Sequence, residues 1–285
     1  MKKLLLLAFV FTNGLLFCQG GKLMDQLSLK SKILDSERKY AVYLPSDYDY
    51  SKREYPVLYL LHGAGDDHTG WVQFGEVKSI ADKANKEGSS TSMIIVMPDA
   101  QTQKRGYFNN IEGDWNYENY FFEEFIPFIE KKYRIKSEKR YRAIAGLSMG
   151  GGGSFIYALR HPDMFSSACP LSAYLGPISF EDFYQKNKEE YKGIRKDKVF
   201  NYHSNHNALS IIKNQTDEKL KSVRWYIDCG DDDFLYESNS LAHIALKKRG
   251  IPHEYRVRDG DHNWSYWRSA LPDVLSFITE HFHQK

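Results

Sequence analysis

An apolar stretch that runs directly into a glycine-rich segment restricts the possible folds of this chain more than any other feature. Residues 142–145 (Arg-Ala-Ile-Ala) are typical of a strand, and a Gly-Leu-Ser-Met-Gly segment follows at residues 146–150. The apolar run at residues 150–159 then predicts a helix. Glycines beside a serine permit a tight, strained turn in which larger side chains would clash. A strand, such a turn and a helix form a nucleophile elbow, which would lift the hydroxyl of Ser148 above the edge of a sheet.

Strand-like and helix-like segments alternate along the rest of the chain. Apolar or alternating runs predict strands at residues 27–34, 38–44, 56–61, 92–97, 141–145, 165–171, 225–229 and 253–257. Helical patterns occur at residues 77–86, 120–133, 150–159, 240–249 and 269–281. Continuously apolar strands are typical of a sheet that is covered on both faces. The alternation therefore predicts an α/β fold, with a mostly parallel central sheet and helices on both faces.

A polar stretch interrupts this alternation. Residues 179–222 are rich in Lys, Asn and Glu and contain only fragments of a helical pattern. We interpret them as an insertion near the mouth of the active site, although a solvated surface excursion would have the same composition. No shift in composition and no internal repeat divides the chain. We therefore expect residues 21–285 to form a single domain.

The first twenty residues predict an export signal. Two lysines follow the initiator methionine, and residues 4–17 are almost wholly apolar, which is too short for a comfortable membrane span. Cleavage near Gly20 would suit the preference for small residues. A buried element of the fold is one alternative. A lipid anchor at Cys18 is another, which the bulky Phe17 disfavours. We expect a secreted or periplasmic protein without a stable membrane span.

Composition argues against several kinds of partner. The formal net charge is only +2, and the basic residues form no stripe of the kind that binds nucleic acid. Removal of the export signal would leave Cys169 and Cys229, which both lie in apolar strand-like runs. Buried free thiols are therefore expected rather than a disulfide. Because no CxxC motif or His/Cys cluster has metal-ligand spacing, we expect neither a metal nor an organic cofactor.

The serine needs a histidine to take its proton and a carboxylate to orient that histidine. In a fold with a nucleophile elbow these residues follow in the order Ser, Asp, His. Of the ten histidines, His262 lies in a loop between the last predicted strand and the last helix, where the base should stand. One strand earlier lie Asp228 and the run Asp231-Asp232-Asp233. Three adjacent aspartates cannot all be buried and charged, so one should face the histidine. Asp228 is the least expected, because it lies within the strand.

Two backbone N–H groups should bind the negatively charged oxygen of the reaction intermediate. The turn places the N–H of Met149 beside the serine, and a second donor should follow the third strand. There the chain reads His62-Gly63-Ala64-Gly65, so we expect the N–H of Ala64, or alternatively that of Gly65, to complete this oxyanion hole. Each donor contributes about 3–4 kcal/mol in comparable sites. His62 is expected to shape the loop rather than to transfer protons.

Four motifs together resemble those of the esterase D-like hydrolases, which have the α/β-hydrolase fold. The motifs are Leu61-His62-Gly63, Gly146-Leu147-Ser148-Met149-Gly150-Gly151, Asp228-Cys229-Gly230 with Asp233-Phe234-Leu235, and Gly260-Asp261-His262-Asn263-Trp264. Within that group the chain is most similar to the feruloyl and acetyl-xylan esterases of carbohydrate esterase family 1. The resemblance extends from about residue 38 to the C-terminus. It implies that Asp233 is the acid and that His262 and Trp264 form the family's His-x-Trp pattern. Residues 179–222 depart from it.

The resemblance implies a secreted serine carboxylic-ester hydrolase without cofactors. The expected activity is that of a feruloyl esterase, which releases ferulate from plant cell-wall arabinoxylan through an acyl-enzyme. Its partner would be a small ester or a feruloylated or acetylated polysaccharide. An acetyl-xylan esterase, a siderophore esterase or an S-formylglutathione hydrolase are alternatives. A non-catalytic carbohydrate-binding relative is a further alternative, but such proteins generally lack a member of the triad.

Aromatic residues crowd the segment between residue 99 and the next helix. They are Tyr107, Phe108, Trp115, Tyr117 and Tyr120. Rings at this edge of the sheet could hold a feruloyl group or a sugar, and we expect such contacts from Trp115 and Tyr117. Gly65 and Trp264 are further expected contacts, from the oxyanion loop and the histidine loop. The alternative is that these rings pack into the core, which is the commoner environment of an aromatic side chain.

Overall fold

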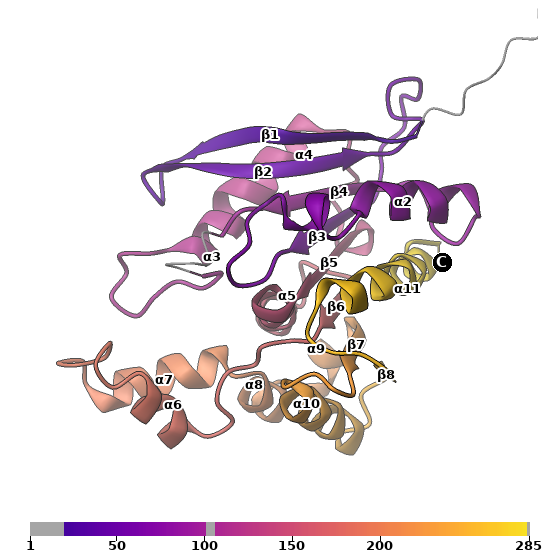
Figure 1. Cartoon of the computed structure of the whole chain (residues 1–285). Helices are drawn as coiled ribbons and strands as arrows, with labels where there is room; N and C mark the ends of the chain where they lie inside the picture. Colours follow the sequence, from indigo (N-terminus) through magenta and orange to yellow (C-terminus); the bar gives the residue numbers. More distant parts are fainter. Residues whose placement is uncertain (1–19, 101–105, 284–285) are drawn as a thin grey trace, which may run out of the picture.

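A central sheet of eight strands, in the order β1-β2-β4-β3-β5-β6-β7-β8, organises the chain (Figure 1). The structure is a computed structural model that describes residues 20–100 and 106–283. The strands are β1 (Lys22–Ser31), β2 (Ser36–Leu44), β3 (Val57–Leu61), β4 (Ile94–Pro98), β5 (Arg142–Leu147), β6 (Ser167–Leu171), β7 (Arg224–Gly230) and β8 (His253–Arg258). β2 pairs antiparallel with β1 and β4, and all remaining pairs are parallel. The predicted α/β fold with a mostly parallel sheet is confirmed.

Helices cover both faces of the sheet. They are α1 (Gly70–Gln73), α2 (Val77–Lys86), α3 (Tyr117–Asn119), α4 (Ile126–Lys132), α5 (Ser148–Arg160), α6 (Phe180–Lys186), α7 (Lys196–His206), α8 (Ala208–Asn214), α9 (Asp217–Lys221), α10 (Tyr236–Lys248) and α11 (Trp264–His283), with a π-helical segment η1 (Tyr120–Phe125) and a 3₁₀ turn η2 (Lys139–Tyr141). The helix predicted at residues 120–133 is thus divided. Pro127 stands in the first turn of α4, where its missing N–H is tolerated.

Two hydrophobic cores lie on the two faces of the sheet. Successive side chains of a strand point to opposite faces. In β3, Val57, Tyr59 and Leu61 therefore join the core beneath α4, α5, α8 and α10. Leu58 and Leu60 join the core beneath α2 and α11. Burial on both faces explains why the central strands are continuously apolar.

The polar segment at residues 179–222 forms short helices, α6 to α9. Few of its side chains are buried, so the helical pattern is weak in the sequence. The exceptions include Ala208 and Ile212 of α8, which pack into the core beneath α5 and α10. α6 and α7 project on the same side of the molecule as α3 (Figure 1). Within this segment, α8 is anchored in the core, whereas α6 and α7 project from the rest of the molecule.

Both cysteines of the described chain are buried free thiols, as predicted. Cys169 lies in β6 and Cys229 in β7. Burial raises the pKa of the Cys229 thiol to about 12, and the nearby negative charges of Asp233 and Asp228 add to this effect. The thiol therefore stays protonated at neutral pH.

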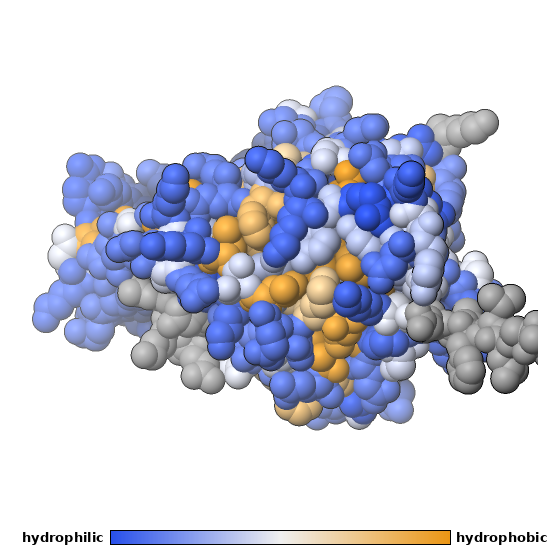
Figure 2. All heavy atoms as spheres, turned by 90° about the horizontal axis from the view of Figure 1, so that it is seen from above, coloured by the Kyte–Doolittle hydropathy of each residue, from blue (hydrophilic) through white to orange (hydrophobic). Residues whose placement is uncertain are grey.

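The surface of the described residues is mainly polar. Figure 2 shows the face seen from above Figure 1, on which hydrophilic side chains surround an irregular band of apolar ones. Among residues 20–100 and 106–283, no helix has both the length and the apolar character that crossing a membrane requires. The predicted export signal at residues 1–20 falls almost entirely outside the described residues, as does Cys18.

Candidate active site

The turn between β5 and α5 has the predicted strained geometry. Ser148 has a φ of 52°, in the left-handed region that side chains rarely adopt. A Cβ atom added to Gly146 would lie 2.4 Å from the carbonyl oxygen of Gly150, and one added to Gly150 would lie 2.5 Å from that of His62. No side chain fits at either position. The flanking glycines therefore allow the serine to stand at the C-terminal edge of the sheet.

Three side chains from separate loops form one chain of hydrogen bonds at this edge. The Nε2 atom of His262 lies 2.9 Å from the Oγ atom of Ser148. Its Nδ1 atom lies 2.8 Å from an Oδ atom of Asp233. Asp231 and Asp232, which precede this carboxylate, are exposed. Of the aspartates 228 and 231–233, Asp233 is the one whose carboxylate contacts His262.

Asp233 is a buried carboxylate with several hydrogen-bond donors. Its side chain is fully buried, and its Oδ1 atom accepts the N–H of Leu235 at 2.8 Å. Burial alone would raise the pKa of Asp233. Hydrogen bonds from His262, from the hydroxyl of Ser172 and from Leu235 outweigh that effect and hold the pKa below its ordinary value. The group is therefore an anion at neutral pH, as required of a residue that orients a histidine.

Asp228 in β7 forms hydrogen bonds with residues on both sides of the loop that carries His262. It is fully buried within β7 and accepts hydrogen bonds from Tyr226 at 2.9 Å, from Arg258 at 3.0 Å and from Tyr266. Arg258 ends β8 and Tyr266 lies in the first turn of α11. These two residues flank the loop that carries His262. From the sequence we considered Asp228 only as the least expected catalytic acid and did not predict this supporting role.

His62 is part of the loop that follows β3. Its Nε2 atom accepts the N–H of Ala100 at 3.1 Å, so its Nδ1 atom carries the proton, which it donates to the carbonyl oxygen of Gly63 at 2.9 Å. Burial lowers the pKa of His62 and favours the neutral ring. The carbonyl of Gly63 and the N–H of Ala64 belong to one planar peptide and point in opposite directions. By holding that carbonyl, His62 orients the N–H of Ala64.

The aromatic segment before α3 lies mainly in the core. Tyr117 is 0% exposed and donates its hydroxyl proton to the carbonyl of Asp99 at 3.2 Å. Trp115 is 8% exposed, stacks on Tyr117 and donates its indole N–H to the carbonyl of Gly106 at 2.8 Å. The expectation that Tyr117 contacts substrate is therefore wrong, because its ring is sealed inside the molecule. Trp115 retains only a narrow exposed edge.

Two residues with exposed rings that contact the triad, one through its ring and one through its backbone, were not predicted from the sequence. Phe234 is 69% exposed, and its ring lies 4.5 Å from the ring of His262, centroid to centroid. Tyr174 is 42% exposed, and its N–H donates to the carbonyl of Ser148 at 2.9 Å. Both follow the C-terminal end of a strand closely. An aromatic residue just after the end of a strand is the sequence feature that could have indicated a position near the active site.

The remaining predicted contacts are accessible. Trp264 is half-buried and packs against Trp71 and Trp267, with centroid separations of 5.2 and 5.4 Å. Gly65 is exposed, with a φ of 83° and no heavy atom within 4 Å of an added Cβ atom. Neither residue is excluded from contact with a ligand.

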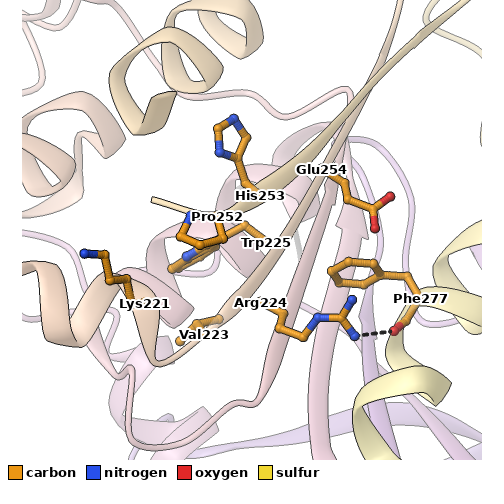
Figure 3. Close-up of a pocket in the computed structure, with 8 residues that line it drawn as sticks. All are labelled: Lys221, Val223, Arg224, Trp225, Pro252, His253, Glu254 and Phe277. Carbon is orange, nitrogen blue, oxygen red and sulfur yellow. Dashed lines mark hydrogen bonds between the residues drawn. The ribbon is translucent and has the colours of Figure 1, made fainter. Parts of the chain in front are cut away.

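A pocket at the opposite edge of the sheet is separate from this site. It is lined by the first residues of β7 and β8, among them Trp225 and His253. Figure 3 shows that its polar side chains do not converge, since His253, Glu254 and Lys221 point to different sides. Ser148 follows the C-terminal end of β5, so the pocket lies at the far end of the strands. It offers no chemistry comparable with the triad.

Acidic side chains gather on the surface near the triad. Carboxylate oxygens of Asp231, Asp232 and Asp259 lie within 4.8 Å of one another, and all three residues are exposed. Exposed acidic groups are solvated and need no bound cation. They therefore do not by themselves define a metal site.

Known esterases match this chain in sequence and in structure. Residues 31–278 match the family model for Esterase. An endo-1,4-beta-xylanase/feruloyl esterase of Xylanibacter ruminicola is 38% identical over 264 residues, which are 90% of this chain and 31% of that protein. The chain thus spans less than a third of the length of this relative.

Solved structures give the same result. A ferulic acid esterase has a TM-score of 0.81 at 37% identity, covering 92% of this chain and 99% of its own. An S-formylglutathione hydrolase from Agrobacterium tumefaciens has a TM-score of 0.74 at 23% identity, covering 92% and 96% of the two chains, a likeness that shows the fold alone. Since the family model spans most of the sheet and the fold is shared along nearly the whole length, the chain belongs to the Esterase family and has the α/β-hydrolase fold.

Proposed function

We propose that the chain hydrolyses carboxylic esters with Ser148 as nucleophile, His262 as base and Asp233 as the residue that orients the base. The observation that carries this proposal is the unbroken hydrogen-bond chain from the Oγ atom of Ser148 to His262, at 2.9 Å, and on to Asp233, at 2.8 Å. A serine hydroxyl is a weak nucleophile until a neighbouring base removes its proton. This arrangement supplies that base at hydrogen-bond distance.

The proposed reaction proceeds through an acyl-enzyme. The Oγ atom of Ser148 forms a bond to the ester carbonyl carbon while its proton passes to the Nε2 atom of His262. The tetrahedral intermediate then releases the alcohol, which takes that proton. Water attacks the acyl-enzyme, gives a proton to His262 and releases the acid, and the proton returns to Ser148. No cofactor takes part in these steps.

The oxyanion hole is assigned to the N–H groups of Met149 and Ala64, with Gly65 as the alternative to Ala64. Met149 follows the nucleophile directly in the chain. A Cβ atom added to Gly63 would lie 3.5 Å from the Cβ atom of Ser148, so the loop that leads to Ala64 runs against the nucleophile. Donors placed in this way stabilise the alkoxide that forms in the transition state.

The substrate class that we propose is an ester of an aromatic acid such as ferulate. Two relatives at 37–38% identity are described as feruloyl or ferulic acid esterases. The exposed ring of Phe234 stands beside His262, and exposed Tyr174 is joined through its backbone N–H to Ser148, so the planar ring of a feruloyl group could lie against these side chains. Attachment of the ferulate to arabinoxylan is part of the same proposal.

Export and domain organisation also belong to the proposal. Residues 1–20 would act as a signal peptide that is removed near Gly20, with a lipid anchor at Cys18 as the less favoured route. Residues 21–285 would form one esterase domain, with residues 179–222 near the mouth of the site. N-terminal sequencing of the exported protein should begin close to residue 21. An exported chain that retains residue 1 would contradict this assignment.

The test of the activity is the Ser148→Ala variant with methyl ferulate as substrate. We expect kcat to fall by at least about a thousandfold, since removal of the nucleophile of a serine triad costs on the order of a millionfold in a comparable enzyme. A fluorophosphonate probe should label the unaltered protein and not the variant. Near-native turnover by Ser148→Ala would refute the mechanism. If acetylated xylan is cleaved faster than methyl ferulate by the unaltered protein, the ester hydrolase stands and the feruloyl assignment is wrong.

A further inference from the structure

The loops that carry the acid and the base of the triad are bonded to each other along their first residues. The N–H of Asp231 donates to the carbonyl oxygen of Arg258 at 3.1 Å, and the N–H of Asp232 donates to that of Gly260 at the same distance. In return, the N–H of Gly260 donates to the carboxylate of Asp231 at 3.0 Å. These bonds fix the chain where it enters residues 259–263, the histidine loop, which carries His262.

Where the chain leaves the histidine loop, it is held by Tyr266. The backbone N–H of Tyr266 donates to the side-chain oxygen of Asn263 at 3.1 Å, the bond by which an N-cap residue fixes the start of a helix. Its ring is buried against the backbone of both loops, since a Cβ atom added to Gly260 would lie 2.4 Å from a ring carbon and one added to Gly230 would lie 3.3 Å from another. The position of this ring therefore determines where α11 begins relative to the sheet.

Asp228 joins the two ends of the histidine loop. Its Oδ1 atom accepts the hydroxyl of Tyr266, and its Oδ2 atom accepts a guanidinium N–H of Arg258 at 3.0 Å. The guanidinium carbon also lies 4.7 Å from the centre of the Tyr266 ring. A further donor, the hydroxyl of Tyr226 at 2.9 Å, comes from β7 itself and adds no link to the loop. One carboxylate thus closes the histidine loop between residues 258 and 266.

The burial of this carboxylate argues for a role in orientation. Asp228 is fully buried and pairs with the partly exposed Arg258. Taking a carboxylate out of water is costly, and an ion pair in such a place often stabilises a fold no more than apolar side chains of the same size would. Hydrogen bonds differ from apolar packing in that each donor must point at one acceptor atom. The bonds to Asp228 therefore fix the relative positions of Arg258 and Tyr266 more narrowly than apolar packing would.

From these contacts we propose that Asp228 is a positioning residue for catalysis, which holds the histidine loop in place through the hydroxyl of Tyr266 and the guanidinium of Arg258. The inference rests on the proposed function. The ring of His262 must stay within hydrogen-bond distance of the other two triad members at once, at 2.9 and 2.8 Å. A displacement of its loop lengthens at least one of these bonds, and a shift of about 1 Å in a catalytic group can lower the rate about a hundredfold.

The experiment compares Tyr266→Phe with Tyr226→Phe, with methyl ferulate as substrate. Each change removes one hydroxyl from the same carboxylate and keeps a buried ring in place, but only Tyr266 follows the histidine loop. For Tyr266→Phe we expect kcat to fall by roughly tenfold to a hundredfold, because His262 is held less closely. Tyr226→Phe is the matched control and should keep a nearly native kcat. KM should change little in both variants, since the exposed rings that would meet the substrate are unaltered.

Counting the active sites separates positioning from a loss of folded protein. The fluorophosphonate probe is allowed to react to completion, and kcat is expressed per labelled serine. A purely structural role would lower the number of labelled sites in both variants alike and leave kcat per site native. Native kcat per labelled site in Tyr266→Phe, or equal falls in the two variants, would overturn the proposal.

Arg258→Met tests the other end of the loop. Methionine keeps much of the side-chain length and removes the guanidinium. Its control is Ser269→Ala, because Ser269 accepts the other guanidinium N–H at 3.0 Å and ties Arg258 to α11 without involving Asp228. We expect kcat per labelled site to fall in Arg258→Met and to stay near native in Ser269→Ala. Native kcat in Arg258→Met, or an equal fall in Ser269→Ala, would contradict the link through Asp228.

These outcomes are distinct from a failure of the proposed function. An inactive Ser148→Ala together with fully active Tyr266→Phe and Arg258→Met variants would refute this inference and leave the proposed function standing. If the unaltered protein hydrolyses no ester, the proposed function itself is wrong, and the inference falls with it.

Discussion

At the scale of single residues, glycines decide how closely the nucleophile helix approaches the sheet. Gly150, Gly151, Gly152 and Gly153 open α5, and an added Cβ atom at Gly152 would lie 2.1 Å from the carbonyl oxygen of Tyr174. That carbonyl belongs to the loop after β6, so the obstacle is backbone and cannot turn away. The glycine run thus brings α5 against the loop that carries one of the exposed rings.

Gly152→Ala should therefore destabilise the protein, although it lies in a helix. Alanine ordinarily favours a helix over glycine by about 1 kcal/mol. Here we expect the free energy of unfolding to fall by about 1–3 kcal/mol, the usual cost of overpacking. Urea denaturation measures the difference. Gly113→Ala is the comparison, since its φ of 79° is strained but nothing lies within 4 Å of the added atom. A stabilised Gly152→Ala variant would contradict the close approach of the two backbones.

Phe234 gives a second prediction at this scale. The ring is mostly exposed, so Phe234→Ala should cost little stability. If the ring lies against the aromatic acyl group, KM for methyl ferulate should rise several-fold, because an aromatic pair contributes about 0.5–1.5 kcal/mol beyond burial. Hydrolysis of p-nitrophenyl acetate, whose acyl group has no ring, should hardly change. Equal effects on both substrates would show that Phe234 acts on the triad instead.

At the scale of elements, one buried carboxylate joins three helices. Glu118 of α3 contacts Arg160 at the end of α5 at 2.7 Å, His161 at 3.0 Å and His206 at the end of α7 at 3.8 Å. Burial alone would raise the pKa of Glu118. Hydrogen bonds from the two histidines and the charge of Arg160 outweigh it and lower the pKa to about 2. Glu118 and its three partners, which we call the Glu118 node, link α7 of the polar segment to α5, the helix that begins at Ser148.

This node makes stability depend on pH in a defined window. The folded-state pKa of Glu118 lies below its ordinary value of 4.5, so the group stabilises the fold above that value, and the stabilisation is lost as the pH falls towards about 2. Linkage makes this contribution on the order of 3 kcal/mol. Glu118→Gln should reduce the free energy of unfolding at pH 7, and the difference from the unaltered protein should shrink between pH 4.5 and pH 2. Urea denaturation across this range is the measurement, and a difference that does not vary with pH would contradict the assignment.

At the scale of the whole molecule, one continuous sheet connects both cores. Alternating side chains of β2, β3, β4 and β5 line both cores. Residues 179–222 share in this arrangement through α8, which packs against α5 and α10. The loops that carry Ser148, Asp233 and His262 leave three different strands of that sheet. The geometry of the triad therefore depends on the integrity of the sheet.

We accordingly expect residues 21–285 to unfold in one cooperative transition. Loss of activity, tryptophan fluorescence and far-ultraviolet circular dichroism should give the same midpoint in urea. The tryptophans report on both cores, since Trp71 and Trp267 lie in one and Trp225 in the other. Two separate midpoints would show that residues 179–222 or the β1–β2 edge form an independent unit.

Several features follow from the sequence alone. The apolar strand followed by glycines predicts the turn at Ser148, because only glycine tolerates the close contacts on either side of it. The position of His262 between a strand and the last helix predicts that it reaches the same edge. The order of strands and helices predicts the α/β fold. These features are local or periodic, so spacing along the chain is enough to reveal them.

Other features depend on contacts between distant segments. Asp231, Asp232 and Asp233 are adjacent and chemically identical, and only burial beside His262 distinguishes Asp233. Tyr117 is buried and Phe234 exposed, although both are aromatic residues in segments that connect a strand to a helix. The burial of a ring is set by what the rest of the chain packs against it. The sequence by itself determined which edge of the sheet carries the chemistry, and the tertiary structure decided which side chains at that edge meet one another and which face water, because that choice depends on packing between segments that the sequence places far apart.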